Sequence, residues 1–386
     1  MPGGVETLPP GARIGIIGGG QLGRMLALAA RQMGYRIIVL DPDPDSPAAQ
    51  VADDMIVAKY SSRDAARELA RKSDVLTYEF ENVDAEAVEA AAEITPLHPS
   101  DGVLRKAQHR VREKEALTAG GFPVAKFWPV ETESEFTRAI SDLGVPVVLK
   151  TATMGYDGKG QAVIRSEDEA EQAFQALGGG RSQLVLERFV PFKMEVSVIC
   201  ARDGSGHAVT FPCSENVHVD GILDVSIVPA RVSPGVAEAA SRLAAGIAEA
   251  LNVVGLIAVE MFVTQDDALL VNELAPRPHN SGHYTMDACR TSQFEQLARI
   301  LCGLPMGAVD MPRPAVMVNL LGDAWEDAGG QPDFASALAV PGVSLHLYGK
   351  AEARKGRKMG HITAVADDVE TALANATAAR DRARRR

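Results

Sequence analysis

A glycine-rich stretch near the N-terminus, GIIGGGQLGRML, limits what the first part of the chain can form. Gly18, Gly20 and Gly23 match the G-x-G-x-x-G spacing that joins a strand to a helix in dinucleotide-binding domains. Apolar segments flank these glycines, and Asp41 ends the next apolar segment, where such domains bind a ribose hydroxyl. The stretch predicts a strand, a tight turn and a helix. It makes a nicotinamide-dependent oxidoreductase the first hypothesis to test.

The composition excludes several classes of protein. A chain of 386 residues is too long for one ordinary hydrophobic core, and 46% hydrophobic with 23% charged residues is typical of a soluble globular protein. A net charge of -12 argues against a nucleic-acid partner. No apolar run approaches the roughly 18 residues of a membrane span, and the N-terminus lacks a signal peptide's pattern. We therefore expect a cytoplasmic protein without a membrane partner.

The cysteines do not indicate a metal site or a disulfide framework. They are scattered without C-x-x-C spacing, and we expect them to be reduced core residues. They are Cys200, Cys213, Cys289 and Cys302.

The order of predicted elements divides the chain into regions. Residues 1–12 are expected to be disordered, and residues 13–105 alternate strands and helices, which predicts a parallel α/β sheet. Residues 106–311 mix strands and helices in an α+β pattern, and residues 312–386 contain short strands and a terminal helix. No internal repeat is visible.

Two glutamates lie on neighbouring predicted strands. If Asp266 and Asp267 form a two-residue hairpin loop, the register places Glu260 directly opposite Glu273. Facing carboxylates repel by up to about 1 kcal/mol, and a bound divalent cation would remove that penalty. Oxygen ligands without nearby Cys or His favour Mg²⁺. The alternative, two exposed glutamates on a solvated face, is weakened by the apolar neighbours Val259, Met261, Phe262, Leu270 and Val271.

The segment after Glu273 is rich in hydrogen-bond donors. The sequence ELAPRPHNSGH contains Arg277, His279, Asn280 and His283, between prolines and a glycine that restrict the backbone. A single histidine is usually structural, but this density of donors beside a carboxylate pair is typical of a site that holds an anionic intermediate.

A lysine and a glycine-rich loop suggest a phosphate site. Lys150 ends a predicted strand, and the loop TMGYDGKGQ follows it. Glycines allow backbone N–H groups to approach phosphate oxygens, and lysine supplies a positive charge. The pattern alone is weak, because a strand, a glycine turn and a strand also make an ordinary hairpin. There is no Walker motif.

Taken together, these motifs resemble a known family. Lys150, GYDGKGQ, ERFVPFKME, the pair Glu260 and Glu273, and NELAPRPHNSGH look like an ATP-grasp enzyme. ENVHVDGIL, YEFENV and LHLYGKAEARKGRKMGH are similar to the 5-(carboxyamino)imidazole ribonucleotide synthetases, from about Arg13 to the last helix. The resemblance implies an ATP-grasp fold with an N-terminal Rossmann-like pre-ATP-grasp domain, a lid at about residues 121–190 and a small C-terminal domain.

The resemblance also implies an activity. Enzymes of this family carboxylate 5-aminoimidazole ribonucleotide in de novo purine synthesis, using ATP and bicarbonate, and release ADP and phosphate. The reaction passes through carboxyphosphate. ATP and Mg²⁺ are the implied cofactors, and a homodimer is the implied assembly.

The resemblance places ATP on particular residues. Arg110 and Lys150 would bind its phosphates, Glu187 and Val190 its adenine, and Glu195 its ribose, while Glu260 and Glu273 would hold Mg²⁺. His109 departs from the family, where relatives often have Asp before the arginine. The full ATP set is Arg110, Lys150, Gly155, Tyr156, Asp157, Gly158, Lys159, Gly160, Gln161, Glu187, Arg188, Phe189, Val190, Glu195, His218, Asn272 and Glu273.

The remaining positions would bind the ribonucleotide and the intermediate. In this family the glycine-rich stretch binds no nicotinamide and helps to seat the substrate. A basic loop near the C-terminus, which would otherwise be a solvated surface, would bind its 5′-phosphate. The implied substrate residues are Gln21, Leu22, Glu79, Tyr156, Asp157, Lys350, Arg357 and Lys358. Arg277, His279 and Asn280 are the implied catalytic residues.

Three alternatives remain. The formate-dependent glycinamide ribonucleotide transformylases share the fold, but have GELG where this chain has GQLG and lack the ENVHVDGIL stretch. The second is the dinucleotide oxidoreductase suggested by the first motif. The third is a catalytically silent nucleotide-binding regulator, against which the presence of Lys150, Glu260, Glu273 and Arg277 argues.

Overall fold

The computed structural model describes residues 6–153, 155 and 160–384. The glycine-rich stretch lies in a four-stranded parallel sheet of order β3-β2-β1-β4. Its strands are β1 (Arg13–Ile17), β2 (Arg36–Asp41), β3 (Asp54–Val57) and β4 (Val75–Tyr78). Its helices are α1 (Gln21–Gln32), η1 (Ala49–Val51), α2 (Arg63–Lys72) and α3 (Ala85–Ala92). This confirms the predicted α/β construction.

The N-terminal segment is held more firmly than its sequence predicts. The Thr7 hydroxyl donates to the Gly303 carbonyl at 3.0 Å, and the Leu8 amide donates to the Cys302 carbonyl at 3.0 Å. Tyr35 in turn donates its hydroxyl to the Leu8 carbonyl. These long-range bonds involve residues 7 and 8 of the segment for which disorder was expected, and the limits of that segment stay a prediction. Residues 1–5 lie outside the described residues.

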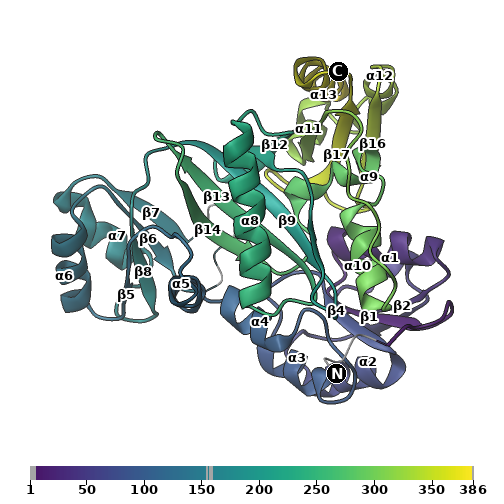
Figure 1. Cartoon of the computed structure of the whole chain (residues 1–386), viewed down its shortest axis with the longest axis horizontal. Coiled ribbons are helices and arrows are strands. Elements are labelled where there is room, and N and C mark those ends of the chain that lie inside the picture. The colour runs from purple at the N-terminus through teal and green to yellow at the C-terminus, as the bar shows by residue number, and fades with distance from the viewer. Residues whose placement is uncertain (1–5, 154, 156–159, 385–386) are drawn as a thin grey trace.

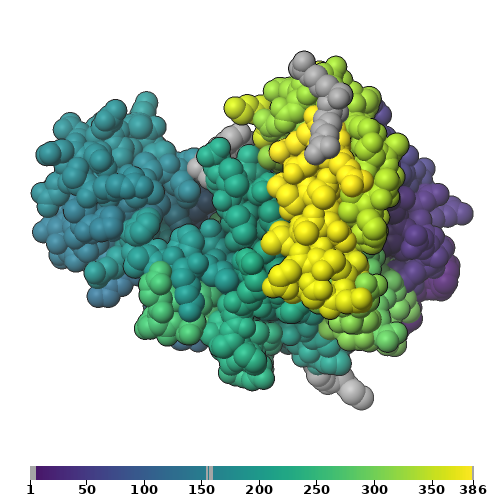
Figure 2. All heavy atoms as spheres, turned by 90° about the horizontal axis from the view of Figure 1, so that it is seen from above, coloured from purple at the N-terminus to yellow at the C-terminus, as the bar shows by residue number. Residues whose placement is uncertain are grey.

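Two helices connect this domain to a four-stranded antiparallel sheet of order β5-β8-β6-β7. The helices are α4 (Asp101–Ala107) and α5 (Arg110–Ala119), and the strands are β5 (Phe127–Val130), β6 (Val147–Thr151), β7 (Gln161–Ile164) and β8 (Leu184–Arg188). The helices α6 (Glu133–Leu143), η2 (Glu167–Glu169) and α7 (Ala170–Ala176) complete this region. It forms one end of the molecule in Figures 1 and 2, within the region for which a lid was predicted.

The centre of the molecule is a nine-stranded sheet of order β14-β13-β9-β11-β12-β15-β17-β16, with β10 paired to β9. Its strands are β9 (Phe192–Arg202), β10 (Ala208–Thr210), β11 (Ser214–Val219), β12 (Ile222–Val228), β13 (Gly255–Thr264), β14 (Leu269–Ala275), β15 (Ala315–Leu321), β16 (Val343–Leu347) and β17 (Lys358–Val365). Because β12 pairs with β15, the C-terminal strands extend this sheet. The predicted domain boundaries at residues 105/106 and 311/312 stay predictions.

Helices cover both faces of the central sheet (Figure 1). They are α8 (Pro234–Ala250), η3 (Asn280–Gly282), α9 (Thr285–Ala288), α10 (Gln293–Leu301), α11 (Asp323–Asp327), α12 (Phe334–Leu338) and α13 (Val369–Ala383). On β9, Val198 and Cys200 pack in the cluster of α8, whereas Ile199 and Ala201 pack in the cluster of α1 and α10. Successive side chains point to opposite faces, so burial on both faces requires the nearly continuous apolar sequence. No helix among the described residues is long and apolar enough to cross a membrane.

Candidate active site

The hairpin of β13 and β14 brings the two predicted carboxylates together. Glu260 is paired with Glu273 in the strand register, as predicted. The loop differs, because the Thr264 amide donates to the Ala268 carbonyl, and three residues lie between them, with Asp267 at a φ of 66°. A β-bulge next to Glu260 shifts the register back by one residue. The two shifts cancel, so the pair forms although the predicted two-residue loop is wrong.

The bulge gives Asn272 a special place. Val271 pairs with Met261 and Glu273 with Glu260, so Asn272 is the extra residue between them. Its side-chain oxygen lies 3.5 Å from the Lys150 ammonium, and its carbonyl accepts a hydrogen bond from Lys114 at 3.2 Å. The bulge thus turns Asn272 toward the lysines of the predicted phosphate site, which supports its assignment to the ATP set.

The two carboxylates differ in what balances their charge. Burial alone would raise the pKa of Glu260, but His279, whose Nε2 lies 2.9 Å from its carboxylate, lowers it below the usual range. The pKa of Glu273 is raised by removal from bulk water and then by the charge of Glu260. Arg110 is the cation nearest to Glu273 in an ion pair, at 3.9 Å. Among the described residues Glu273 therefore lacks close compensation, as expected of a ligand for a cation.

A further glutamate and a histidine approach Glu260. Ligand atoms of Glu195, His218 and Glu260 all lie within 4.8 Å of one another. Burial lowers the pKa of His218, but Glu195, at 3.1 Å, raises it more. These residues could also hold a cation beside Glu260. The sequence assigned Glu195 and His218 to the nucleotide, and the structure places both beside the predicted metal pair.

A buried ion triad lies behind the predicted phosphate site. The Glu187 carboxylate is 3.1 Å from the Lys150 ammonium and 3.3 Å from that of Lys114, and all three are buried. Burial raises the pKa of Glu187, but the two lysines lower it further. One oxygen of Glu187, Oε2, thus serves both lysines, whereas Oε1 is buried and has no hydrogen-bond partner among the described residues. Sequence reasoning missed Lys114, although it lies four residues after Arg110 on the same face of α5.

The described part of the glycine-rich loop contacts Arg110. Arg110 donates to the Thr151 carbonyl at 3.1 Å and to the Gly155 carbonyl at 3.4 Å. A Cβ at Gly155 would lie 2.4 Å from the guanidinium, so a larger residue there would displace the Arg110 side chain. Gly160 has a φ of 72° and precedes Gln161, which pairs with Lys150. The predicted site residues Tyr156, Asp157, Gly158 and Lys159 lie outside the described residues.

The other predicted adenine residues follow β8. The Arg188 amide donates to the Lys126 carbonyl at 2.8 Å, and the Phe189 amide donates to the Pro146 carbonyl at 3.2 Å. Val190 accepts a hydrogen bond from the Phe192 amide. They form the connection from β8 to β9, next to Glu187 and Glu195 in the chain, and their contact with adenine stays a prediction.

Two of the predicted catalytic residues, His279 and Arg277, act on the Glu260 carboxylate. Arg277 forms a bidentate ion pair with Glu81, which follows β4 in the YEFENV stretch. Asn280 is 8% exposed, and within the described chain both polar atoms of its side chain lack a partner. A buried amide without partners costs free energy unless a ligand satisfies it. Sequence reasoning missed Glu81, although its motif had been noted.

His283 does not join these donors. It is fully buried, and its Nδ1 lies 3.2 Å from the Gln293 amide nitrogen. Its ring packs 4.8 Å from that of His361, and burial holds its pKa well below the usual value. The expectation that His283 converges with the donors near the metal pair is wrong, because the chain after Asn280 turns it into the core.

The glycine-rich turn between β1 and α1 is filled by the protein's own carboxylates. Glu79 accepts hydrogen bonds from the amides of Gly20 and Gly23, the latter at 2.8 Å. Asp41 accepts one from the Gly19 amide at 2.6 Å. A dinucleotide would need these same N–H groups for its pyrophosphate. The oxidoreductase hypothesis therefore lacks its binding site.

The basic loop near the C-terminus lies against this turn. Gln50 donates to the Gly349 carbonyl at 2.8 Å, and the charge of Lys350 acts on the Glu79 carboxylate. Lys350 donates to the Lys358 carbonyl at 2.7 Å and lies 5.7 Å from the Tyr348 ring. Gln21 and Leu22, the first residues of α1, lie in the chain between Gly20 and Gly23, whose amides donate to Glu79. Arg357 donates to the Glu352 carbonyl at 2.8 Å.

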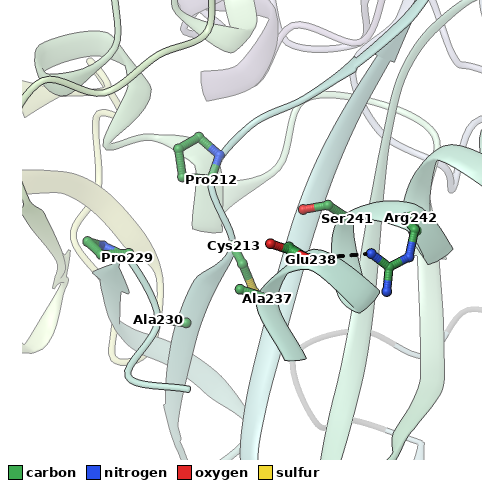
Figure 3. A pocket seen from close by; sticks show the side chains of 8 residues that line it. All are labelled: Pro212, Cys213, Pro229, Ala230, Ala237, Glu238, Ser241 and Arg242. Carbon is green, nitrogen blue, oxygen red and sulfur yellow. Dashed lines mark ion pairs between the residues drawn. The ribbon is translucent and has the colours of Figure 1, made fainter. Parts of the chain in front are cut away.

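A surface hollow of about 470 Å³ lies elsewhere. Its lining is Pro212, Cys213, Pro229, Ala230, Ala237, Glu238, Ser241 and Arg242 (Figure 3). Glu238 and Arg242 pair along α8 at 3.6 Å, and burial raises the pKa of the Cys213 thiol to about 12. The hollow contains none of the predicted site residues and no reactive thiolate.

Comparisons with known proteins agree with this arrangement. Family models for a ribonucleotide synthetase preATP-grasp domain, an ATP-grasp domain and a phosphoribosylaminoimidazole carboxylase C-terminal domain match residues 12–108, 115–294 and 315–375. The N5-carboxyaminoimidazole ribonucleotide synthase of Bacillus subtilis is 51% identical over 93% of this chain and 92% of its own length.

Two solved structures are also similar. An ADP complex of an N5-carboxyaminoimidazole ribonucleotide synthetase has a TM-score of 0.92 and 48% identity, covering 97% of both chains. An Aspergillus clavatus N5-carboxyaminoimidazole synthase with ADP and 5-aminoimidazole ribonucleotide has a TM-score of 0.89 and 34% identity, covering 97% of this chain and 99% of its own. The chain therefore belongs to the N5-carboxyaminoimidazole ribonucleotide synthase family of ATP-grasp ligases.

Proposed function

We propose that this protein carboxylates 5-aminoimidazole ribonucleotide on its exocyclic nitrogen, using ATP and bicarbonate and releasing ADP and phosphate. The observation that supports this best is the unpaired, buried amide of Asn280, beside His279 and Arg277. An anion bound within reach of Asn280 would complete its hydrogen bonding, and the neighbouring Arg277 and His279 would add charge and a further donor. A cytoplasmic homodimer remains part of the proposal by resemblance alone.

The ATP side of the site is built on the hairpin and α5. Lys150 and Arg110 would bind the phosphates, with Lys150 kept in place by Glu187 and Asn272. Glu260 and Glu273 would hold Mg²⁺, because their carboxylates face each other and repel, and a hard cation that prefers oxygen ligands would relieve this repulsion. Bound Mg²⁺ would neutralise charge on the triphosphate.

The chemistry explains why these donors are needed. Bicarbonate is a poor electrophile, because negative oxygens surround its carbon. Transfer of the γ-phosphoryl group to a bicarbonate oxygen gives carboxyphosphate and ADP, and the substrate's amine then receives the carboxyl carbon as phosphate leaves. Water would destroy this mixed anhydride, so the site must exclude it. Arg277, His279 and Asn280 would hold the intermediate, and Glu81 orients Arg277.

The ribonucleotide would lie between the first and last regions of the chain. Gln21, Leu22 and Glu79 come from the pre-ATP-grasp sheet, and Lys350 reaches the same turn from the C-terminal loop. A phosphate there would meet Lys350, and Arg357 and Lys358 lie nearby in sequence. We assign Tyr156 and Asp157 to the aminoimidazole ring by resemblance.

An assay of ADP release tests the proposal. Full-length protein is given Mg²⁺, ATP and 5-aminoimidazole ribonucleotide, with bicarbonate added or removed by degassing. We expect ADP release to require both the ribonucleotide and bicarbonate. ADP release that requires formate and glycinamide ribonucleotide would assign the chain to the transformylase reaction and overturn the proposal.

A further inference from the structure

His279 is attached to a chain of buried polar side chains that crosses the central sheet. Its Nδ1 lies 2.8 Å from the Ser281 hydroxyl, which lies 2.7 Å from the Ser197 hydroxyl. The Asn216 amide nitrogen donates to Ser197 at 2.9 Å, and the Ser226 hydroxyl donates to the Asn216 oxygen at 3.0 Å. All four partners are at most 5% exposed.

This chain lies where apolar side chains would pack more easily. Ser197 stands opposite Glu260 in the register of β9 and β13, and Asn216 and Ser226 are paired on β11 and β12. Burying these groups costs free energy unless every one is hydrogen-bonded, and a fully bonded network specifies one arrangement. The network ends on the ring of a predicted catalytic residue, so its arrangement determines how that ring is presented.

The direction of the protons in the chain can be read from one backbone group. The Ser281 amide donates to Nδ1 of His279 at 3.4 Å, and a backbone N–H can only be a donor, never an acceptor. Nδ1 is therefore an acceptor, and the Ser281 hydroxyl must donate to it as well. Ser281 then accepts from Ser197, which accepts from Asn216. Every proton in the chain points toward His279.

The backbone of His279 is held separately. The Gln293 side chain accepts from the His279 amide at 2.9 Å and donates to its carbonyl at 2.8 Å. The fully buried side-chain amide of Gln293, on α10, thus uses both its oxygen and its nitrogen to hold the backbone of His279. The Gln293 amide fixes the position of the His279 backbone, and the hydroxyl groups of Ser281 and Ser197 determine which ring nitrogen of His279 carries the proton.

We propose that Ser281, Ser197 and Asn216 are positioning residues that hold the His279 ring with Nδ1 as an acceptor, so that Nε2 is the nitrogen that donates toward the site. Nε2 lies 2.9 Å from the Glu260 carboxylate, and its single N–H can turn to an anion only when Glu260 is engaged by another partner such as a cation. This inference rests on the proposed function for the identity of that anion, a bicarbonate-derived acyl phosphate. A donor at Nε2 suits it, whereas the other tautomer would present a lone pair to Glu260.

Nitrogen NMR tests the tautomer without substrate. The full chain is labelled with ¹⁵N-histidine, and two-bond ¹H–¹⁵N spectra at pH 8 report which ring nitrogen carries a proton. His279→Gln identifies the signal among the eight histidines of the chain. We expect a protonated Nε2 and a bare Nδ1. A proton on Nδ1, alone or together with one on Nε2, would overturn the proposal.

Variants test the role of the chain. Ser197→Ala does not touch His279, yet should mix the two tautomers and lower kcat about fivefold to tenfold, with KM for ATP within about twofold. Ser281→Ala, which removes the last link, should do the same. The matched control is Ser73→Ala, which removes a buried hydroxyl bonded to the Leu69 carbonyl in the N-terminal domain. It should leave spectrum and kcat unchanged.

The outcomes separate this inference from the proposed function. Unchanged spectra and kcat in both Ser197→Ala and Ser281→Ala would overturn the positioning role. Equal losses in Ser73→Ala would also overturn it, because they would indicate a general effect on stability. If Ser197→Ala does not fold, the wild-type spectrum and Ser281→Ala still decide. If ADP release requires formate, the proposed function fails while the tautomer result stands.

Discussion

Two groups of carboxylates, one at the glycine-rich turn and one in the hairpin of β13 and β14, are balanced in different ways in this protein. In the glycine-rich turn, Glu79 and Asp41 accept hydrogen bonds from backbone amides of residues 19, 20 and 23. In the hairpin, Glu260 faces Glu273, and the cation paired with Glu273 is 3.9 Å away. The first group is satisfied from within the fold, whereas in the second Glu273 keeps a repulsion from Glu260.

The difference teaches how a ligand site is distinguished from a structural one. A glycine-rich turn before a helix offers N–H groups to any anion, and here the anion is the protein's own side chain. In the hairpin Glu260 has His279 as an internal partner, whereas the cation paired with Glu273 among the described residues is Arg110, 3.9 Å away. The unsatisfied group marks the place for a ligand, even though the satisfied one carries the better-known motif.

Among the changes considered, Glu273→Gln in the hairpin should have the largest effect on activity. The amide keeps the shape but removes one anionic ligand for the cation, so turnover of ATP should fall by at least about a hundredfold. The melting temperature should stay the same or rise slightly, because the repulsion from Glu260 is relieved. Steady-state ADP release and thermal unfolding measure the two effects. Near-normal turnover would make Glu273 a surface residue without a role.

Replacing Lys350 and Arg357 together by Ala tests whether the filled turn borders the substrate site. Each charge-assisted contact to a phosphate contributes about 1.5–3 kcal/mol, so KM for 5-aminoimidazole ribonucleotide should rise about a hundredfold or more. The affinity for ATP, measured by calorimetry, should barely change. Lost ATP binding with unchanged KM for the ribonucleotide would place the basic loop on the nucleotide side.

Much of the fold followed from sequence because it depends on local pattern. Alternating apolar and helical segments predicted the parallel sheet, and the strand register predicted the pair of Glu260 and Glu273. That success contained two errors that cancel, since the hairpin loop has one more residue and the bulge at Asn272 restores the register. A bulge is a local irregularity that periodicity alone does not reveal.

The remaining parts of the site depend on contacts between distant segments. Glu81 meets Arg277 across 196 positions of sequence, and Ser197 meets Ser281 across 84. No spacing rule joins such residues, because only the packing of separate elements brings them together. Lys114 could have been predicted, since it shares a helical face with Arg110. The filling of the glycine-rich turn by Glu79 could not.

The two groups of carboxylates should differ in the ligands that bind beside them. If the amides of the turn are occupied, NADH should not raise the melting temperature. Mg²⁺ with ADP at a hundred times its Kd should stabilise the protein by about 2.7 kcal/mol. Thermal unfolding with each ligand, and with ADP in the presence of a chelator, measures this. Saturable binding of NADH in the micromolar range would show that Glu79 leaves the turn for a dinucleotide.

Glu79→Gln is the structural counterpart of Glu273→Gln and should have the opposite effect on stability. The glutamine keeps one acceptor but presents an NH₂ group where the second oxygen stood, so the amide of Gly20 or Gly23 loses its partner. A buried donor left unpaired costs about 1–3 kcal/mol, and the free energy of unfolding in urea should fall by that amount. The exposed Glu249→Gln on α8 is the matched control and should change it by less than about 0.5 kcal/mol. If Glu79→Gln is as stable as this control, the carboxylate does not hold the turn together, and the contrast between the two groups is lost.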